Sequence, residues 1–263
     1  MIKYDVFDAI EDNDLKALIG FASSIESGGW AWSPLHKAAK LGRTELLGFI
    51  LKQQSSVAIN DSFEIGEPDD FRSGTALTEA LMNGHIDTAI FLIEQGANVN
   101  ETYYGYEDTH CLGLEIEESG TCLTLAIALG NDELLQLMGK HGLNLNETFQ
   151  FDRREMTAFA YYLECADIKA LQKLFDLGTD ITALVKDEWN NDVTPLMLAV
   201  RLYNPYQKIQ GDSTREKRLA VIEWLLRHGV DLGYVHEESE LSTVLSVVMD
   251  ANDHELNQLF GFI

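Results

Sequence analysis

Hydrophobic residues recur at helical spacing along this chain, in segments of two kinds that alternate. The leucine-rich kind comprises 46–51, 89–93, 134–138, 171–175 and 221–226. Apolar residues three and four positions apart lie on one face of a helix, so each segment predicts an amphipathic helix with one core-facing stripe. A shorter apolar segment precedes each of them. The pattern therefore predicts helix–turn–helix units that repeat along the chain.

Start and stop signals support this division. A Ser or Thr that can cap a helix precedes the shorter segment at Ser33, Thr75, Thr121, Thr157 and Thr194, with a degenerate copy at 242–244. Pro34 and Pro195 suit the first helical position, where the missing N–H costs nothing. The second helices of four units end at a glycine able to adopt the left-handed conformation, namely Gly96, Gly142, Gly178 and Gly229.

The Ser33-Pro34-Leu35-His36 start and the exit Gly96-Ala97-Asn98-Val99-Asn100 resemble the ankyrin repeat. The resemblance implies an all-α, ankyrin-repeat solenoid of about seven helix–turn–helix units including caps, with long hairpin-loop insertions. It further implies a single domain over 1–263. The expected units are approximately 5–29, 30–70, 71–116, 117–152, 153–189, 190–237 and 238–263.

Acidic side chains far outnumber basic ones: 43 Asp and Glu against 19 Lys and Arg give a formal net charge of −24. No Lys or Arg occurs between Arg72 and Lys140. Phosphate binding depends on Lys and Arg, so neither nucleic acid nor an anionic membrane is expected as a partner. The charge favours a basic protein instead. No apolar run approaches the roughly 18 residues of a membrane span.

Partner contact is predicted for aromatic and acidic residues in the hairpins and insertions that precede the first helices. They are Trp30, Trp32, Asp69, Asp70, Phe71, Tyr103, Tyr104, Tyr106, Glu107, Asp108, Glu115, Glu117 and Glu118. Tryptophan is enriched among binding hot spots, and tyrosine supplies contact area at low entropic cost. The alternatives are that Trp30 and Trp32 fold back over the adjacent repeat as core, and that the tyrosines pack locally in a solvated loop.

Chemical motifs are absent from the sequence. The acidic clusters lack the spaced oxygen ligands and glycine turn of a calcium loop, so a solvated acidic face is expected and no metal or other cofactor. No phosphate loop, nucleophile elbow or paired-cysteine site occurs. The resemblance gives His36 a structural role, hydrogen-bonding between neighbouring hairpins. We therefore expect no enzymatic activity.

A freestanding acidic array of this kind favours a stoichiometric inhibitor, an immunity-type protein that neutralises a basic toxin or nuclease domain. A general scaffold, adaptor or chaperone-like protein is the alternative, and a nucleic-acid mimic ranks lower. Three cysteines at unpatterned spacing suit a reducing compartment, and no signal peptide is visible at the first residues, so a cytoplasmic monomer is expected.

Overall fold

The computed structural model describes residues 4–22, 25, 32–53, 59–65, 72–104, 119–151, 154–203, 212–230, 244–251 and 253–261. The chain divides into two compact units, Met1–Phe151 (unit 1) and Asp152–Ile263 (unit 2). This division does not test the expected single domain over 1–263, which remains a prediction.

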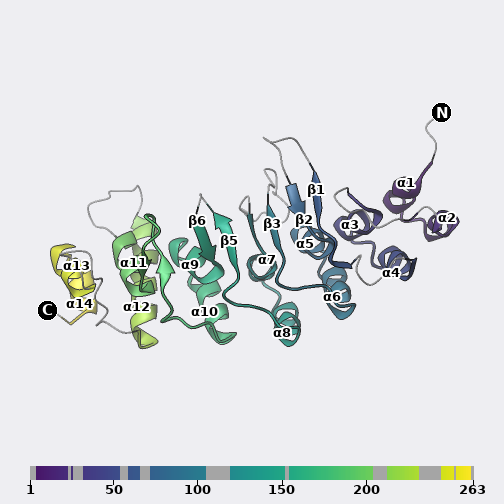
Figure 1. Cartoon of the computed structure of the whole chain (residues 1–263). Coiled ribbons are helices and arrows are strands. Elements are labelled where there is room, and N and C mark those ends of the chain that lie inside the picture. The colour runs from purple at the N-terminus through teal and green to yellow at the C-terminus, as the bar shows by residue number, and fades with distance from the viewer. Residues whose placement is uncertain are drawn as a thin grey trace. The chain divides into compact units, whose positions relative to one another are not determined.

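Helices occur in consecutive pairs, as the hydrophobic pattern predicts (Figure 1). The four pairs of unit 1 are α1 (Val6–Glu11) and α2 (Leu15–Gly20), α3 (Pro34–Lys40) and α4 (Thr44–Gln53), α5 (Ala76–Met82) and α6 (Ile86–Glu94), and α7 (Cys122–Leu129) and α8 (Asp132–Lys140). The three pairs of unit 2 are α9 (Ala158–Glu164) and α10 (Ile168–Asp176), α11 (Pro195–Tyr203) and α12 (Asp212–Arg227), and α13 (Val244–Ala251) and α14 (His254–Leu259). Seven pairs in the described residues confirm the predicted number of repeats.

The predicted caps start the first helices. Thr75 and Thr121 each accept a hydrogen bond from the backbone N–H three residues later, and the hydroxyl oxygens of Thr78 and Thr124 accept one from the backbone N–H of the cap residue. These capping boxes satisfy N–H groups that have no partner within the helix. Thr157 and Thr194 accept in the same way from Ala160 and Met197.

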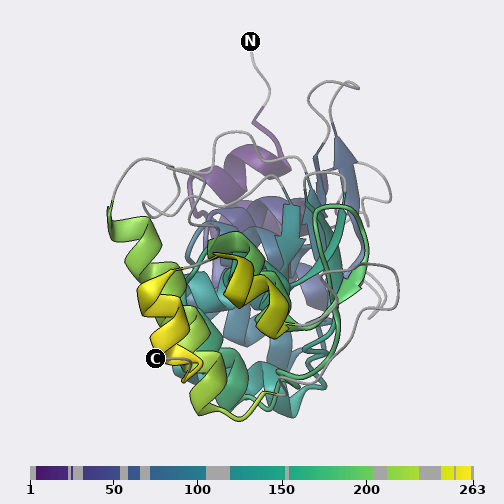
Figure 2. The ribbon, with the colours of Figure 1, turned by 90° about the vertical axis from the view of Figure 1, so that its left-hand side faces the viewer.

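Short strands connect the helix pairs and add to the helices that the sequence predicted. In unit 1, β1 (Phe63–Ile65), β2 (Arg72–Gly74), β3 (Thr102–Tyr104) and β4 (Ser119–Thr121) form one antiparallel sheet in this order, and β5 (Thr148–Phe151) ends the unit. We call β1–β4 the four-stranded sheet. It lies on one side of the helices of unit 1 (Figure 2). Unit 2 begins with β6 (Arg154–Thr157) and contains the antiparallel pair β7 (Val185–Lys186) and β8 (Asp192–Val193).

Side chains of the first helices fill the core between repeats. Every residue of α5 is buried, and α3, α7, α9 and α11 are buried along most of their length. The second helices bury only one stripe, as Leu46, Leu47 and Ile50 do in α4. Each repeat therefore has an inner helix and an outer helix, and burial of the inner helix needs a neighbouring repeat on each side.

Candidate protein-binding fingers

The four-stranded sheet has one face that solvent reaches. Glu64 pairs with Ser73, and Ser73 pairs with Tyr104, so these residues form a row across three strands of one face. Glu64 is exposed, and the side chain of Tyr104 is 47% exposed. Neighbouring strands are about 4.8 Å apart, which separates the backbones of Glu64 and Tyr104 by about 10 Å along the row. The row therefore presents an acid and an aromatic ring on a fixed backbone.

The opposite face of the same sheet is buried. Phe63 pairs with Gly74 and Tyr103 pairs with Gly120. In both strand pairs, β1–β2 and β3–β4, an aromatic residue therefore lies opposite a glycine. A Cβ atom added at Gly120 would lie 2.6 Å from the Tyr103 Oη atom, so only glycine leaves room for that ring. Tyr103 is 3% exposed and belongs to the core. Of the two adjacent tyrosines predicted to touch a partner, Tyr104 alone faces solvent.

Trp32 packs within unit 1. Its ring centroid lies 5.0 Å from that of Phe63 on β1, and Lys40 Nζ lies 5.2 Å from the centroid of its ring. The side chain is half-buried. Trp32 thus packs partly against its own unit without being core, and its contact with a partner stays a prediction. The remaining predicted contact residues lie outside the described residues: Trp30, Asp69, Asp70, Phe71, Tyr106, Glu107, Asp108, Glu115, Glu117 and Glu118.

His36 has a structural role, as the resemblance implied, and it joins α3 to the segment that leads into β1. The Ser33 backbone N–H donates to Nδ1 over 3.2 Å, which leaves Nε2–H to donate to the Asp61 carbonyl over 2.9 Å. The imidazole is fully buried, and burial lowers its pKa. A neutral histidine with a hydrogen bond at each ring nitrogen holds the segment before β1 against α3.

The hairpin β7–β8 of unit 2 is a second finger, and it carries a residue that the sequence analysis missed. Trp189, between the two strands, is 67% exposed, the highest value among the large hydrophobic residues that the structure describes as exposed. Asn190 beside it has a φ of 65°. The sequence 188–191 could have indicated an exposed tip, because an Asn-Asn pair after a tryptophan is typical of a tight turn between strands.

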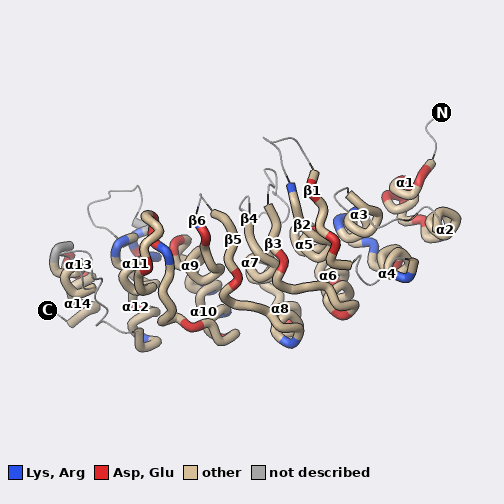
Figure 3. The backbone as a smooth tube through the Cα atoms, viewed as in Figure 1, with Lys and Arg blue, Asp and Glu red and all other residues tan. Residues whose placement is uncertain are grey.

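Acidic residues of the described chain serve several purposes. Asp5, Asp14, Asp167 and Asp253 cap helices, where a carboxylate also complements the helix dipole. Glu79 is fully buried in α5 and adds nothing to the exposed acidic surface. Figure 3 shows acidic and no basic positions along the tube from α6 to β3. The field of unit 1 is therefore negative, although several of its carboxylates also stabilise the fold.

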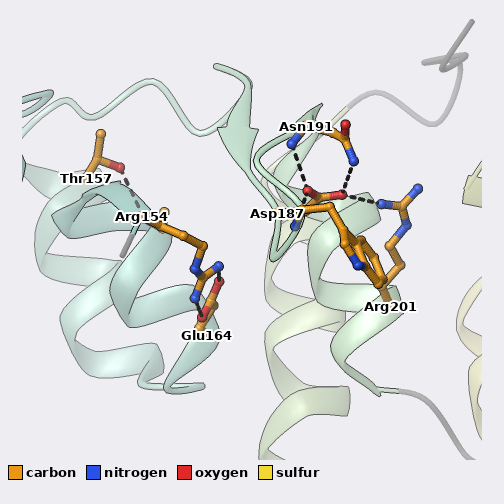
Figure 4. A network of polar contacts seen from close by, with 8 residues as sticks. Arg154, Thr157, Glu164, Asp187, Asn191 and Arg201 are labelled. Carbon is orange, nitrogen blue, oxygen red and sulfur yellow. Dashed lines mark hydrogen bonds and ion pairs between the residues drawn. The ribbon is translucent and has the colours of Figure 1, made fainter. Parts of the chain in front are cut away.

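Two polar clusters organise unit 2 (Figure 4). Arg154 donates to both carboxylate oxygens of Glu164 over 2.9 and 3.0 Å, which joins β6 to the end of α9. Asp187, Asn191 and Arg201 form the second cluster, under the β7–β8 turn. Both arginines are thus used within unit 2.

Groups suited to catalysis are scarce in the described residues. No three His, Cys, Asp or Glu side chains there are grouped as a metal site would require. Cys122 is fully buried, and burial raises the pKa of its thiol, which makes it a poor nucleophile. None of the described helices combines the length and apolar character needed to cross a membrane.

Comparisons with known proteins agree with the fold. Residues 6–103 match a family model described as ankyrin repeats in three copies. The solved ankyrin-repeat domain of Bcl-3, described as a unique member of the IkappaB protein family, superposes with a TM-score of 0.62 at 15% identity, over 97% of this chain and 96% of that one. The human ASB11 ankyrin-repeat domain gives a TM-score of 0.46 at 20% identity, over 87% and 82% of the two chains. No curated protein matches the sequence.

Proposed function

We propose that this chain, an ankyrin-repeat protein and therefore a protein-interaction module, inhibits one basic protein by binding it stoichiometrically. The proposed role is that of an immunity-type protein in the cytoplasm, which covers the active site of a basic toxin or nuclease domain. Binding alone accomplishes this, so the chain needs neither a cofactor nor catalysis. The exposed row of Glu64 and Tyr104 on the four-stranded sheet is the observation that carries the proposal.

The position of this row supports the proposal. β1 is antiparallel to β2 and β3 is antiparallel to β4, so the last residues of β1 and β3 and the first residues of β2 and β4 lie at the same end of the sheet. The sequence between these strand ends comprises the segments 66–71 and 105–118. By sequence they contain Glu67, Asp69 and Asp70, and then Glu107, Asp108, Glu115, Glu117 and Glu118. By sequence, eight further carboxylates therefore fall between the strands whose exposed face carries Glu64 and Tyr104.

The net charge supports a basic partner on physical grounds. Complementary fields steer two proteins together and raise the association rate above the ~10⁵–10⁶ M⁻¹s⁻¹ of a neutral pair. A protein that must intercept a toxic enzyme before it acts benefits from fast capture. Salt screens this attraction over about 8–10 Å at physiological strength, so capture should weaken as salt rises.

The test is affinity purification of the tagged chain at low and high salt, with mass spectrometry of the bound proteins and an activity assay of what is recovered. We expect one basic enzyme that is retained through moderate salt and loses its activity at one equivalent of this chain. Recovery of several neutral or acidic proteins, or of a basic protein whose activity is unaffected, would contradict the inhibitor role.

A paired variant locates the contact. Tyr104→Ala removes the exposed ring of the row, and we expect it to weaken binding of the recovered partner by about tenfold or more. Ile19→Ala is the matched control, because Ile19 is 52% exposed in the same unit but lies on α2. Equal affinities of the two variants would show that the four-stranded sheet is not the contact surface.

A general scaffold is the second candidate, favoured by the acids that cap helices in both units. Asp5 and Asp253 lie near opposite ends of the chain, and each serves its own helix. A negative charge used in this way needs no particular partner. Several housekeeping proteins in the purification would favour the scaffold.

A further inference from the structure

The turn of the β7–β8 finger holds Trp189, the most exposed tryptophan among the described residues. Hydrogen bonds to a buried carboxylate hold the backbone of this turn. Asp187 is 1% exposed, and its carboxylate accepts four hydrogen bonds. The backbone N–H groups of Trp189 and Asn191 donate over 3.0 and 2.8 Å. The side chains of Asn191 and Arg201 donate over 3.2 and 2.8 Å. A buried carboxylate therefore determines the conformation of the turn.

Backbone hydrogen bonds close the same turn. The Asp187 N–H donates to the Asn191 carbonyl and the Asn190 N–H donates to the Asp187 carbonyl, each over 3.0 Å. An exposed indole on a fixed backbone loses little conformational freedom when a partner covers it, which increases its contribution to affinity. Preformed, exposed tryptophans of this kind are among the strongest anchors of protein interfaces.

Ion pairs within unit 2 occupy two of the three acidic residues of the finger, and the third, Glu188, is available to a partner. Asp192 pairs with Lys186 over 2.8 Å, and Asp187 pairs with Arg201 over 2.8 Å. Glu188 is exposed and makes no ion pair with any residue that the structure describes. The tip of the finger therefore presents, at consecutive positions, an exposed carboxylate outside any described ion pair and an exposed indole.

We propose that Glu188 and Trp189 form a docking site for an arginine side chain on the surface of a basic protein. The planar guanidinium stacks on an indole face and donates hydrogen bonds to a carboxylate at the same time, whereas the ammonium of lysine does so less well. The site rests on the proposed function in one respect, that the partner is a basic protein. It adds a contact on unit 2, separate from the row on the four-stranded sheet.

Arginine and lysine peptides of equal charge test the site directly. The chain is labelled with ¹⁵N at its tryptophan indoles and titrated with octa-arginine and, separately, octa-lysine at physiological salt. The resonance of Trp189 is identified by its absence in Trp189→Ala. We expect this resonance to shift and saturate, with an apparent affinity for octa-arginine about threefold to thirtyfold higher than for octa-lysine.

Charge-matched variants isolate the contribution of Glu188. Glu188→Gln should weaken octa-arginine binding at Trp189 by about 1.5-fold to fivefold. Glu216→Gln removes one charge from an exposed residue of α12 in the same unit and should leave the affinity at Trp189 unchanged. Equal effects of the two variants would assign the binding to net charge alone and overturn the site.

Failure of the site and failure of the proposed function can be distinguished. A Trp189 resonance that does not move, or moves equally with both peptides, overturns the arginine site while the purification still reports on the inhibitor. In the complex with the purified partner, Trp189→Ala should lower affinity about tenfold, and Met249→Ala, which truncates another exposed side chain of unit 2, should not. Equal losses would also overturn the site.

Discussion

The four-stranded sheet of unit 1 and the β7–β8 finger of unit 2 occupy equivalent places in their repeats but are held by different forces. In the sheet, Phe63 and Tyr103 each pack over a glycine of the paired strand. In the finger, small Val185 and Val193 pair, and the buried Asp187 fixes the turn. The first solution depends on packed apolar volume, and the second on satisfied hydrogen bonds. A finger can thus keep its shape while its exposed residues change.

The two units also differ in charge. Unit 1 carries 24 acidic against 8 basic residues, and unit 2 carries 19 against 11. Arginines of unit 2 pair with Glu164, Asp187 and Asp253, whereas no Lys or Arg follows Arg72 of β2 in unit 1 until Lys140. Long-range attraction of a basic protein is therefore expected mainly from unit 1, and a local, directional contact from the Trp189 finger.

Truncation of the Phe63 ring should give the largest loss of stability and so the sharpest test of the difference between the two fingers. Phe63→Ala removes a fully buried aromatic side chain and should cost about 3–5 kcal/mol of unfolding free energy. Val193→Ala, in the other finger, should cost only about 1–3 kcal/mol, because a smaller volume is lost. Urea unfolding followed by circular dichroism measures both. Similar costs would show that the two fingers do not differ in their dependence on packing.

Removal of the buried carboxylate should have the next largest effect. Asp187→Ala leaves Arg201 and two backbone N–H groups of the turn without their acceptor and should cost about 2–4 kcal/mol. Asp192→Ala removes the solvent-exposed pair with Lys186 from the same finger and should cost about 0–1 kcal/mol. The comparison fails if the two aspartates prove equally important in urea unfolding.

A methyl group at the tyrosine–glycine pair tests the space under Tyr103. Gly120→Ala should destabilise by about 1–3 kcal/mol, because its Cβ would lie 2.6 Å from both Tyr103 Oη and Thr124 Oγ1. Gly139→Ala is the control: this glycine lies in α8 with no heavy atom within 4 Å of its added Cβ. Alanine there should stabilise by about 0.5–1 kcal/mol. A neutral Gly120→Ala would mean that the ring moves aside easily.

The smallest expected effect concerns the pH dependence of the stability that His36 contributes where α3 meets the segment before β1. Burial lowers the pKa of His36, so between the folded and unfolded pKa values the unfolded state binds more protons. The stability contributed by neutral His36 is present above the ordinary histidine pKa of about 6.5 and is lost as pH falls below it.

Stability measured by urea unfolding between pH 7.5 and pH 5 isolates this contribution. His36→Gln should flatten the fall in stability relative to the unmodified chain. His141→Gln, at an exposed position after α8, should leave the slope as it is. An unchanged slope in His36→Gln would mean that protonation of another group dominates in this range.

Local sequence determined the helix pairs, their caps and their glycine stops. Helical spacing, a capping hydroxyl and a residue tolerant of positive φ act within a few positions of one another, so a single sequence contains them. The four predicted glycines all have positive φ, at 95°, 83°, 97° and 79° for Gly96, Gly142, Gly178 and Gly229. The repeat architecture follows, because an amphipathic helix pair cannot bury its apolar face alone.

Only the tertiary structure decided which side chains of the fingers face solvent. Tyr103 and Tyr104 are adjacent and chemically identical, and strand alternation together with pairing to Gly120 buries the first and exposes the second. Glu79 is buried and Trp189 is exposed, the reverse of what each residue type favours. Exposure depends on strand register and on contacts between residues distant in the sequence, such as Asp187 with Arg201, and the local pattern that determines a helix does not contain them.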